Sequence, residues 1–466
     1  MRTYQELVAC GQSAALRADF VMGVIGERKN SDTYRQAAIA QRYAKKENVT
    51  ISNYRKLLYD INGSAVPDNY SANHKCAAAF FPKFVLQEVQ YLLGNGCTFE
   101  DDTIKDKLQA NSDFDNVMQE AARYALVDGV CYGFRNLDHV ELFRATEFAP
   151  VYDEENGAIM AGVRWWQVDS GKPLRCTLYE IDGYTDYIRR EGEELTILRE
   201  KRAYKLTPVA MQDDGTVIYN GENYPTFPIV PLYGNYEKQS ELIGIRETID
   251  CYDLILSGFA NDLDEASMLY WTLENCGGMD DIDLAKFKQR MRTVGVANLD
   301  GGDSGAKAES HTIDVPYESR KEYLDILERR LYDDAMAFDY KAIASGAATA
   351  TQIKAAYTNL NLKANQLEYC VNRFIQALCN VAGIDDTVIP TYKRDSIINE
   401  MEATQAIMLA ANYLDDETII NKLPFLTPDE VEACLERRNV EGSAMYTPLN
   451  AAQAGAEANT GIVMGE

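Results

Sequence analysis

The chain has 466 residues, and its 46 Lys and Arg stand against 72 Asp and Glu, a formal net charge of −26 at pH 7. Such a chain is a poor candidate for a protein that grips nucleic acid, because those proteins gain affinity by neutralising phosphates with Lys and Arg. Hydrophobic residues at 46% and charged residues at 25% are ordinary globular values, which excludes wholesale disorder. At roughly 150 residues per domain, the length predicts about three modules or one elongated subunit.

The charge is unevenly spread along the chain. Residues 1–60 carry ten basic and six acidic side chains, a net +4, so the remainder carries −30. No apolar run approaches the ~20 residues that span a bilayer, and the richest run, Ala406 to Leu414, is interrupted by Asn412. The start of the chain has no apolar signal-like region, so we expect no secretory signal and a cytosolic context.

The cysteines and histidines argue against a metal site. Ten cysteines are scattered without a Cys-x-x-Cys pair, and there are three histidines. In a chain without a secretory signal we expect reduced, mostly buried thiols. The common Cys/His spacings of zinc sites are absent, so we predict no structural metal and no cofactor.

The first part of the chain is helical in pattern. Residues 1–60 are polar, and apolar residues from Phe84 to Leu93 predict a helix with Pro82 near its start and Gly94 at its end. Asp113 to Asp128 predicts another helix.

From Tyr132 to about Pro231 the pattern changes to alternation with frequent turns. Strand-type residues fill stretches such as Gly162 to Val168 and Leu174 to Ile181. Between such stretches lie turn signals, among them Glu155-Asn156-Gly157, Asp182-Gly183, Glu191-Gly192, Asp213-Asp214-Gly215 and Asn220-Gly221. This pattern predicts an antiparallel β meander and not a βαβ series.

After Pro231 the pattern predicts long helices. Apolar residues recur at spacings of three and four from Leu242 to Leu263, from Leu324 to Phe338 and from Ile353 to Val381. The last of these, at about thirty residues, would be roughly 45 Å long. Antiparallel helix packing is favoured over a free coiled coil.

An insert separates the first two of these helices, and short helices follow the third. The insert predicts a strand from Ser267 to Leu273, a helix from Leu284 to Val294 and a Gly-rich turn at 301–305. Near the end, Thr427-Pro428-Asp429-Glu430 is a capping box that predicts a helix start. The last ~20 residues are rich in Ala, Gly, Asn and Glu, which predicts a loose tail.

Motifs for catalysis are missing. The chain has no phosphate-binding loop, no His-Glu-x-x-His and no Gly-x-Ser-x-Gly elbow. Acidic pairs such as Asp101-Asp102 together with Trp165-Trp166 suggest the alternative of a carbohydrate-active hydrolase, which needs two facing carboxylates near aromatic platforms. Acids adjacent in sequence rarely converge, so we predict that the chain is not an enzyme.

Tyr340 to Thr351 connects two helices with small residues and one charge. Two interpretations stay open from the residues alone. The stretch is either a flexible helix–helix connection or a mobile loop that faces something sliding past it.

The order of these elements resembles the tailed-bacteriophage portal protein family of the Gram-positive siphophage type, over roughly residues 30–440. The matching stretches are Ile61-Asn62, Ala72-Asn73-His74-Lys75, Tyr91-Leu92-Leu93-Gly94, residues 227–235, residues 249–257 and Asn261-Asp262-Leu263. One departure is Thr349 to Lys354, where the family often has Ser-Gly-x-Ala-Leu-Lys.

The resemblance implies an α+β fold, mainly α, of the portal type, with long stem and wing helices, a β meander in the wing and a small α/β clip. The implied parts are a wing at 1–235, stem helices at 237–263 and 318–340, a clip at 264–316, a tunnel loop at 341–351, a long wing helix at 352–384, a crown at 395–440 and a tail at 441–466.

The resemblance also implies a function without cofactor or membrane. It predicts a homo-oligomeric ring, usually of twelve subunits, at one capsid vertex of the virion, assembled in the host cytoplasm. Double-stranded DNA would pass through its channel during packaging and ejection. The implied partners are the terminase large subunit, a head-completion or adaptor protein, and the capsid and scaffolding proteins. The competing hypothesis is a different helical scaffold or adaptor.

The residues give this implication a physical form. Residues 237–274 hold nine acids and two bases, and residues 318–341 hold seven acids and five bases. Acidic rows facing a channel would repel phosphate, and weak contact suits a polymer that must move. The predicted channel residues are Lys341, Ser345, Thr349 and Thr351 in the loop and the acids Glu318, Glu322, Asp325, Asp333 and Asp334. The predicted terminase contact in the clip is Asp280, Lys286, Lys288 and Arg290.

Overall fold

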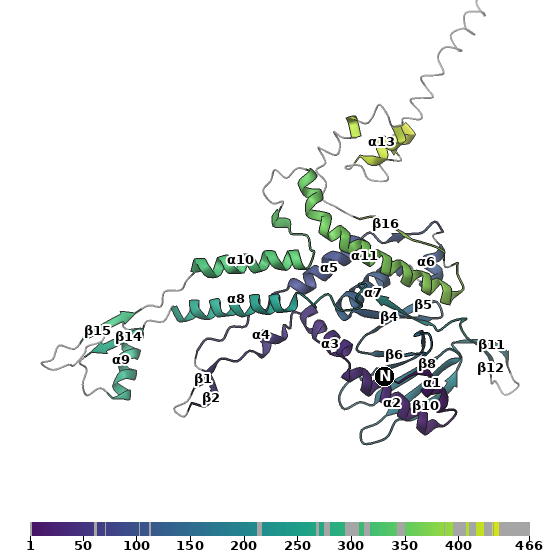
Figure 1. The fold of residues 1–466 in the computed structure, drawn as a ribbon, viewed down its shortest axis with the longest axis horizontal. Helices are drawn as coiled ribbons and strands as arrows, with labels where there is room; N and C mark the ends of the chain where they lie inside the picture. The colour runs from purple at the N-terminus through teal and green to yellow at the C-terminus, as the bar shows by residue number, and fades with distance from the viewer. Residues whose placement is uncertain are drawn as a thin grey trace, which may run out of the picture. The chain divides into compact units, whose positions relative to one another are not determined.

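A computed structural model gives the fold, shown in Figure 1. It describes residues 2–59, 63–69, 71–101, 103–110, 113–211, 217–266, 270–274, 280–293, 307–311, 317–342, 350–385, 387–394, 407–409, 416–423, 431 and 433–437. The chain divides into two compact units. The first contains Met1–Ala337 and Leu362–Arg394, and the second contains Phe338–Asn361 and Asp395–Glu466.

The first unit begins with four helices. They are α1 (Tyr4–Ala9), α2 (Ala14–Asn30), α3 (Asp32–Ala44) and α4 (Val49–Asn53). Ser13 and Ser31 cap α2 and α3, because their hydroxyl oxygens accept hydrogen bonds from first-turn backbone N–H groups. The helical pattern predicted for residues 1–60 is therefore confirmed up to Asn53. A short hairpin of β1 (Leu57–Tyr59) and β2 (Ala65–Pro67) follows.

The next helices agree with the sequence prediction. They are α5 (Phe80–Leu93), which ends at Gly94, α6 (Thr103–Leu108) and α7 (Phe114–Asp128). Gly129 ends α7 with a positive φ of 86°, a conformation that glycine adopts without steric cost. A two-residue strand, β3 (Cys97–Thr98), pairs with β16 (Thr391–Tyr392).

The predicted antiparallel region is confirmed, but it forms three separate sheets. The strands are β4 (Val130–Asn136), β5 (His139–Arg144), β6 (Phe148–Tyr152), β7 (Ile159–Trp166), β8 (Leu174–Glu180), β9 (Gly183–Arg189), β10 (Thr196–Arg202), β11 (Lys205–Met211), β12 (Val217–Glu222) and β13 (Ile229–Tyr233). Strands β6 to β10 make one five-stranded meander, β11 pairs with β12, and β13 returns to pair with β4 beside β5.

Two hydrophobic cores hold the first unit together. The larger one joins α5, α7, the β4–β5–β13 sheet and residues 367–381. Gly133 on β4 makes room there for Phe374, whose ring would lie 2.5 Å from any added Cβ. The smaller core packs α2 on the five-stranded sheet through residues such as Val21 and Val163. Apolar burial of this extent is the main stabilising contribution to such a unit.

Two long helices follow the sheets, and they lie side by side in Figure 1. They are α8 (Arg246–Ala266) and α10 (Tyr317–Asp334). The insert between them contains β14 (Tyr270–Glu274), α9 (Asp281–Thr293) and β15 (Lys307–His311). The predicted strand and helix are present, β15 was not predicted, and the Gly-rich turn lies outside the described residues. Strand β15 pairs antiparallel with β14.

The ends of both long helices differ from the prediction. Leu242 and Ile245 are buried in turns that precede α8, because Gly244 adopts a φ of 94° there. The α10 helix stops at Asp334, and Met336 has a φ of 52°, so the apolar spacing up to Phe338 does not mean a continuous helix.

Helix α11 (Ala350–Ala382) has 33 residues, as the spacing from Ile353 to Val381 predicted. The second unit also contains a 3₁₀ turn, Tyr340–Ala342, and the helix α13 (Asp416–Lys422). Within this unit the rings of Phe338 and Tyr357 stack with centroids 4.2 Å apart. The predicted capping box at 427–430 and the tail at 441–466 lie outside the described residues.

The nine cysteines among the described residues are free thiols, as expected. The prediction that most are buried is wrong, because four are buried and five are half-buried. Over the same part of the chain, every helix is too short or too polar to cross a bilayer. There too, His, Cys, Asp and Glu form no group of three or more placed to hold a metal ion.

Candidate functional site

The acids of α10 are displayed on its outer surface. Glu318, Glu322, Asp325 and Asp333 are all exposed. At about 100° per residue these four positions fall within a sector of about 80° around the helix. Leu327 and Leu331, which are 7% and 0% exposed, point to the opposite side. We call these four residues the acidic stripe.

The fifth predicted acid of α10, Asp334, is exposed but lies outside this stripe. Its carboxylate lies 3.2 Å from Nε of Arg330, one helical turn earlier. Exposed pairs of this kind contribute little to stability. Another ion pair, between Arg320 and Asp262, joins α10 to α8.

Two acids of α8, Asp250 and Asp253, are directed into the protein, while Glu247 and Asp264 are exposed. Asp253 is fully buried, and Asp250 accepts hydrogen bonds from the hydroxyls of Tyr43 and Thr50. The expectation that this helix shows acidic rows to a channel is therefore wrong for Asp250 and Asp253. Their charges are taken up by partners within the chain.

An extended segment, residues 74–78, lies along α8 and is bound by a polar ladder. Backbone N–H groups of His74, Cys76 and Ala78 donate to the side chains of Asn261, Ser257 and Asp253, over 2.7, 2.9 and 2.8 Å respectively. Every second residue of an extended chain is about 6.6 Å from the last, and every fourth residue of a helix is about 6.0 Å from the last. The two spacings nearly match, so one helix face accepts from the N–H groups of three alternate residues.

The last rung of this ladder has a shifted titration. Burial raises the pKa of the Asp253 carboxyl to about 6, although hydrogen bonds from the Asn48 amide and the Ala78 N–H act in the opposite direction. Asn48 also donates to the Ala78 carbonyl, so it ties the ladder to the start of α4.

A buried lysine joins three elements near the inner ends of α8 and α10. Lys363 Nζ lies 3.0 Å from Glu88 of α5 and 2.9 Å from Glu241 in the turns before α8. It also donates to the Ala335 carbonyl just after α10, over 3.2 Å. We call this group the Lys363 junction.

The junction holds one cation between two carboxylates. Burial raises the pKa of Glu88 to about 7, while the Lys363 charge acts to lower it. Burial acts to lower the pKa of Lys363, but the two carboxylates outweigh it and hold this pKa above its usual value. The ammonium form of Lys363 is therefore the form that the fold requires.

The predicted loop residues are only partly described. Lys341 is exposed in the 3₁₀ turn of the second unit, and its backbone N–H donates to Asp339 over 3.0 Å. Ser345 and Thr349 lie outside the described residues. Thr351 falls in the first turn of α11 and not in a loop.

The predicted clip residues lie on and just before α9. Asp280 accepts a hydrogen bond from the Asp283 N–H over 2.9 Å, which caps this helix. Lys286, Lys288 and Arg290 are exposed. Lys286 and Arg290 are four residues apart and so share one face of the helix, while Lys288 points elsewhere.

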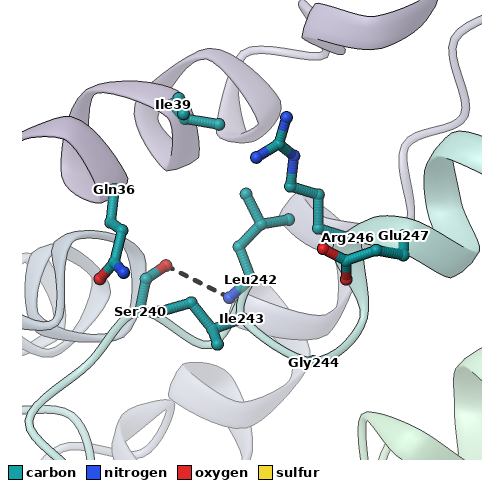
Figure 2. Close-up of a pocket in the computed structure, with 8 residues that line it drawn as sticks. All are labelled: Gln36, Ile39, Ser240, Leu242, Ile243, Gly244, Arg246 and Glu247. Atoms are coloured by element: carbon teal, nitrogen blue, oxygen red, sulfur yellow. Dashed lines mark hydrogen bonds between the residues drawn. The ribbon is translucent and has the colours of Figure 1, made fainter. Parts of the chain in front are cut away.

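A cavity of about 200 Å³ opens where α3 meets the turns before α8. Figure 2 shows the Arg246 side chain extending from the start of α8 toward α3, which carries Ile39, while the Ser240 hydroxyl accepts from the Leu242 N–H. The lining combines three aliphatic side chains, Ile39, Leu242 and Ile243, with the polar residues Gln36, Ser240, Arg246 and Glu247.

The ladder and the Lys363 junction were both missed at the sequence level. Asp253, Ser257 and Asn261 are spaced four apart on the helix face away from its apolar row, which is a readable signal. The partners lie 175 to 187 residues earlier in the chain, and nothing local in that segment predicts them.

Comparison with known protein families identifies the family of this chain. The family model described as "Phage portal protein, SPP1 Gp6-like" matches residues 29–443. Because the match covers most of the chain, the protein belongs to the SPP1 Gp6-like family of phage portal proteins. Its function is that of a phage portal protein.

Two curated relatives are also named portal protein. The one from Bacillus phage SPP1 is 24% identical over 433 residues, which cover 84% of this chain and 81% of that protein. The one from Clostridium phage phiCD119 is 28% identical over 237 residues, and this match spans 49% of the chain and about half, 52%, of that protein.

Similar solved structures come from gene transfer agent particles. A chain in the virion of a native particle is 12% identical, with 77% of this chain and 89% of that chain covered and a TM-score of 0.41. A chain in the neck of a native particle with C12 symmetry is 11% identical, with 76% and 89% covered and the same TM-score.

Proposed function

We propose that this portal protein assembles into a closed ring of about twelve copies through which double-stranded DNA passes during packaging and ejection. The observation that carries the proposal is the acidic stripe of α10, which is exposed along the side opposite its packed leucines. A ring with these carboxylates toward its bore would repel the phosphate backbone and let DNA move without sticking.

The parts of the subunit follow from the family. We assign residues 1–235 to a wing and 264–316 to a clip. The stem consists of residues 237–263 and 318–340, which contain most of α8 and α10. Residues 341–351, the last two of which belong to α11, would form a tunnel loop, 352–384 a long wing helix and 395–440 a crown. In this assignment Lys341, Ser345, Thr349 and Thr351 face the bore.

The proposed partners dock outside the bore. The exposed cations Lys286, Lys288 and Arg290, with Asp280, form the contact for the terminase large subunit. A head-completion or adaptor protein and the capsid and scaffolding proteins bind elsewhere on the ring. In this role the chain acts at a capsid vertex of the virion, after assembly in the host cytoplasm, and performs no catalysis.

Charge reversal of the stripe tests the channel. In the triple variant Glu318→Lys, Asp325→Lys, Asp333→Lys, which keeps Glu322, we expect rings that bind short duplex DNA on the order of tenfold more tightly than wild type at low salt. The same variant should package less DNA when it replaces the portal in a phage packaging assay. Filter binding of a labelled duplex measures the affinity for DNA. Mass photometry checks that the variant forms rings.

A control reverses three exposed acids in turns of the five-stranded sheet, Asp169, Glu191 and Glu193. These variant rings should keep the wild-type affinity for DNA. Stripe variants that form rings yet bind no more DNA than the control would show that α10 does not line the bore. A stable monomer at all concentrations would instead favour a helical scaffold or adaptor.

A further inference from the structure

Residues 54–69, which we call the arm, form the short hairpin of β1 and β2, and residues 60–62 within it lie outside the described range. Every residue of both strands is exposed. Figure 1 shows the arm leaving α4 beside α8, with α8 between the arm and α10. A two-stranded hairpin is marginally stable at best by itself in water, so this one needs a partner surface.

Both faces of the arm carry large apolar side chains. Directly opposed residues of an antiparallel pair share a face, so Leu58 and Val66 occupy one face, and Leu57 and Tyr59 occupy the other. Their exposed fractions are 43% and 40% for the first pair and 55% and 76% for the second. A contiguous exposed apolar surface of this kind marks an interaction site.

The base of the arm is fixed to the first unit. Ile51 just before it is buried, and the Asp68 N–H donates to the Lys56 carbonyl over 2.9 Å. Lys75 donates to the Ser52 carbonyl over 2.6 Å, and the ladder on α8 begins at His74. The arm therefore starts from an ordered base, which lowers the entropy lost when it binds.

A polar cavity of about 340 Å³ lies at this base. Its lining includes Arg55, Lys56, Asn69 and Asn73. The acid in the lining, Asp68, is buried and accepts from the Ser71 N–H over 3.0 Å. The lining therefore carries two cations, Arg55 and Lys56, and one acid, a net positive charge that suits a surface carboxylate of a partner.

The same chain has a surface with the complementary properties on α10. Tyr323 and Ile326 are 44% and 50% exposed on the flank of the helix next to the acidic stripe. Glu322 of the stripe lies within about 40° of Ile326 around the helix. This flank combines apolar side chains with a carboxylate, and the arm combines apolar side chains with cations. The two surfaces are therefore complementary in charge.

We propose that the arm of one copy packs on the Tyr323–Ile326 flank of α10 in a neighbouring copy, with a stripe carboxylate entering the cavity at the base of the arm. This inference rests on the proposed ring, because two different surfaces that meet head to tail give a closed ring when the rotation closes. The arm of one subunit then forms the contact with the stem helix α10 of the adjacent subunit.

Photo-crosslinking on mixed rings tests which surfaces meet. Full-length chains with p-benzoylphenylalanine in place of Tyr59, half of them labelled with ¹⁵N, are assembled, irradiated and analysed by peptide mass spectrometry. We expect crosslinks between a ¹⁴N and a ¹⁵N chain that join residue 59 to the segment 317–334. Rings whose crosslinks stay within one chain, or reach another segment, would overturn the arm contact and leave the ring intact.

Substitution of the arm tests its energetic role. In Leu58→Ser, Tyr59→Ser, we expect the concentration for half-assembly to rise at least tenfold in mass photometry, with an unchanged circular dichroism spectrum. The control Val168→Ser changes an apolar residue that is 85% exposed in a turn after β7, and it should assemble as wild type. Equal assembly of arm and control variants overturns the inference. A wild-type chain that stays monomeric overturns both it and the proposed ring.

Discussion

Helices α8 and α10 lie side by side and are both rich in acids, yet three acids of α8 and four of α10 play opposite roles. Asp250, Asp253 and Asp262 of α8 bind partners inside the chain, whereas the acidic stripe of α10 is exposed. The charge counts of the two segments do not reveal this difference. The local partners decide whether an acid stabilises the fold or contributes to the field at the surface.

Among the substitutions that test contacts inside the fold, we expect the largest effect on stability at the Lys363 junction. Lys363→Met leaves the buried Glu88 and the half-buried Glu241 without their cation, so we expect the free energy of unfolding to fall by about 3–5 kcal/mol. Urea unfolding followed by circular dichroism measures it. The control Lys354→Met removes an exposed lysine from the same helix and should change little. A loss below about 1 kcal/mol for Lys363→Met would mean that the junction is not a structural anchor.

The ladder should give the next largest effect. Asp253→Ala removes the acceptor for the Ala78 N–H and the Asn48 amide, and we expect a loss of about 2–3 kcal/mol. Hydrogen exchange at residues 76–78 should accelerate in the same variant, because the segment loses its rung on α8. Protection that stays at the wild-type level would contradict the ladder as the restraint on this segment.

The pH dependence of stability tests the burial of Glu88 in the Lys363 junction. Burial raises the pKa of Glu88 to about 7, from an ordinary value of about 4.5. The fold therefore favours its protonated form, a stabilisation that is complete below about pH 4 and is lost as pH rises to about 7. We expect wild type to lose about 1–3 kcal/mol more than Glu88→Gln between pH 4.5 and 7.5. Parallel urea titrations of the two proteins measure this, and identical pH profiles would refute it.

We expect the smallest effect on stability for substitutions in the exposed acidic stripe of α10. Asp325→Ala removes an exposed carboxylate of the stripe, and its free energy of unfolding should stay within about 0.5 kcal/mol of wild type. The same urea titration provides the comparison. A loss as large as that of Asp253→Ala would show that α10 also spends its acids on internal contacts and would remove the distinction between the helices.

The sequence predicted the helices and the antiparallel strands well, because apolar spacing and turn residues act locally. It placed Leu242 and Ile245 on a helix since a buried turn and a helix can show the same spacing. Strand β15, Lys-Ala-Glu-Ser-His, was missed because its residues have little strand preference and pairing with β14 imposes the conformation. The ladder and the junction depend on contacts between distant segments, which no local pattern encodes.

The near match between the two spacings in the ladder also sets its length. Each rung adds about 0.6 Å of mismatch between the extended segment and the helix, so after three rungs the offset already exceeds 1 Å. A fourth rung would strain its hydrogen bond, and the chain indeed turns away toward the arm before His74. The N–H groups of the extended segment and their acceptors on α8 therefore stay within hydrogen-bond distance over a few residues only. Insertion of a single residue within 74–78 would turn the wrong set of N–H groups toward α8 and shift where the arm begins.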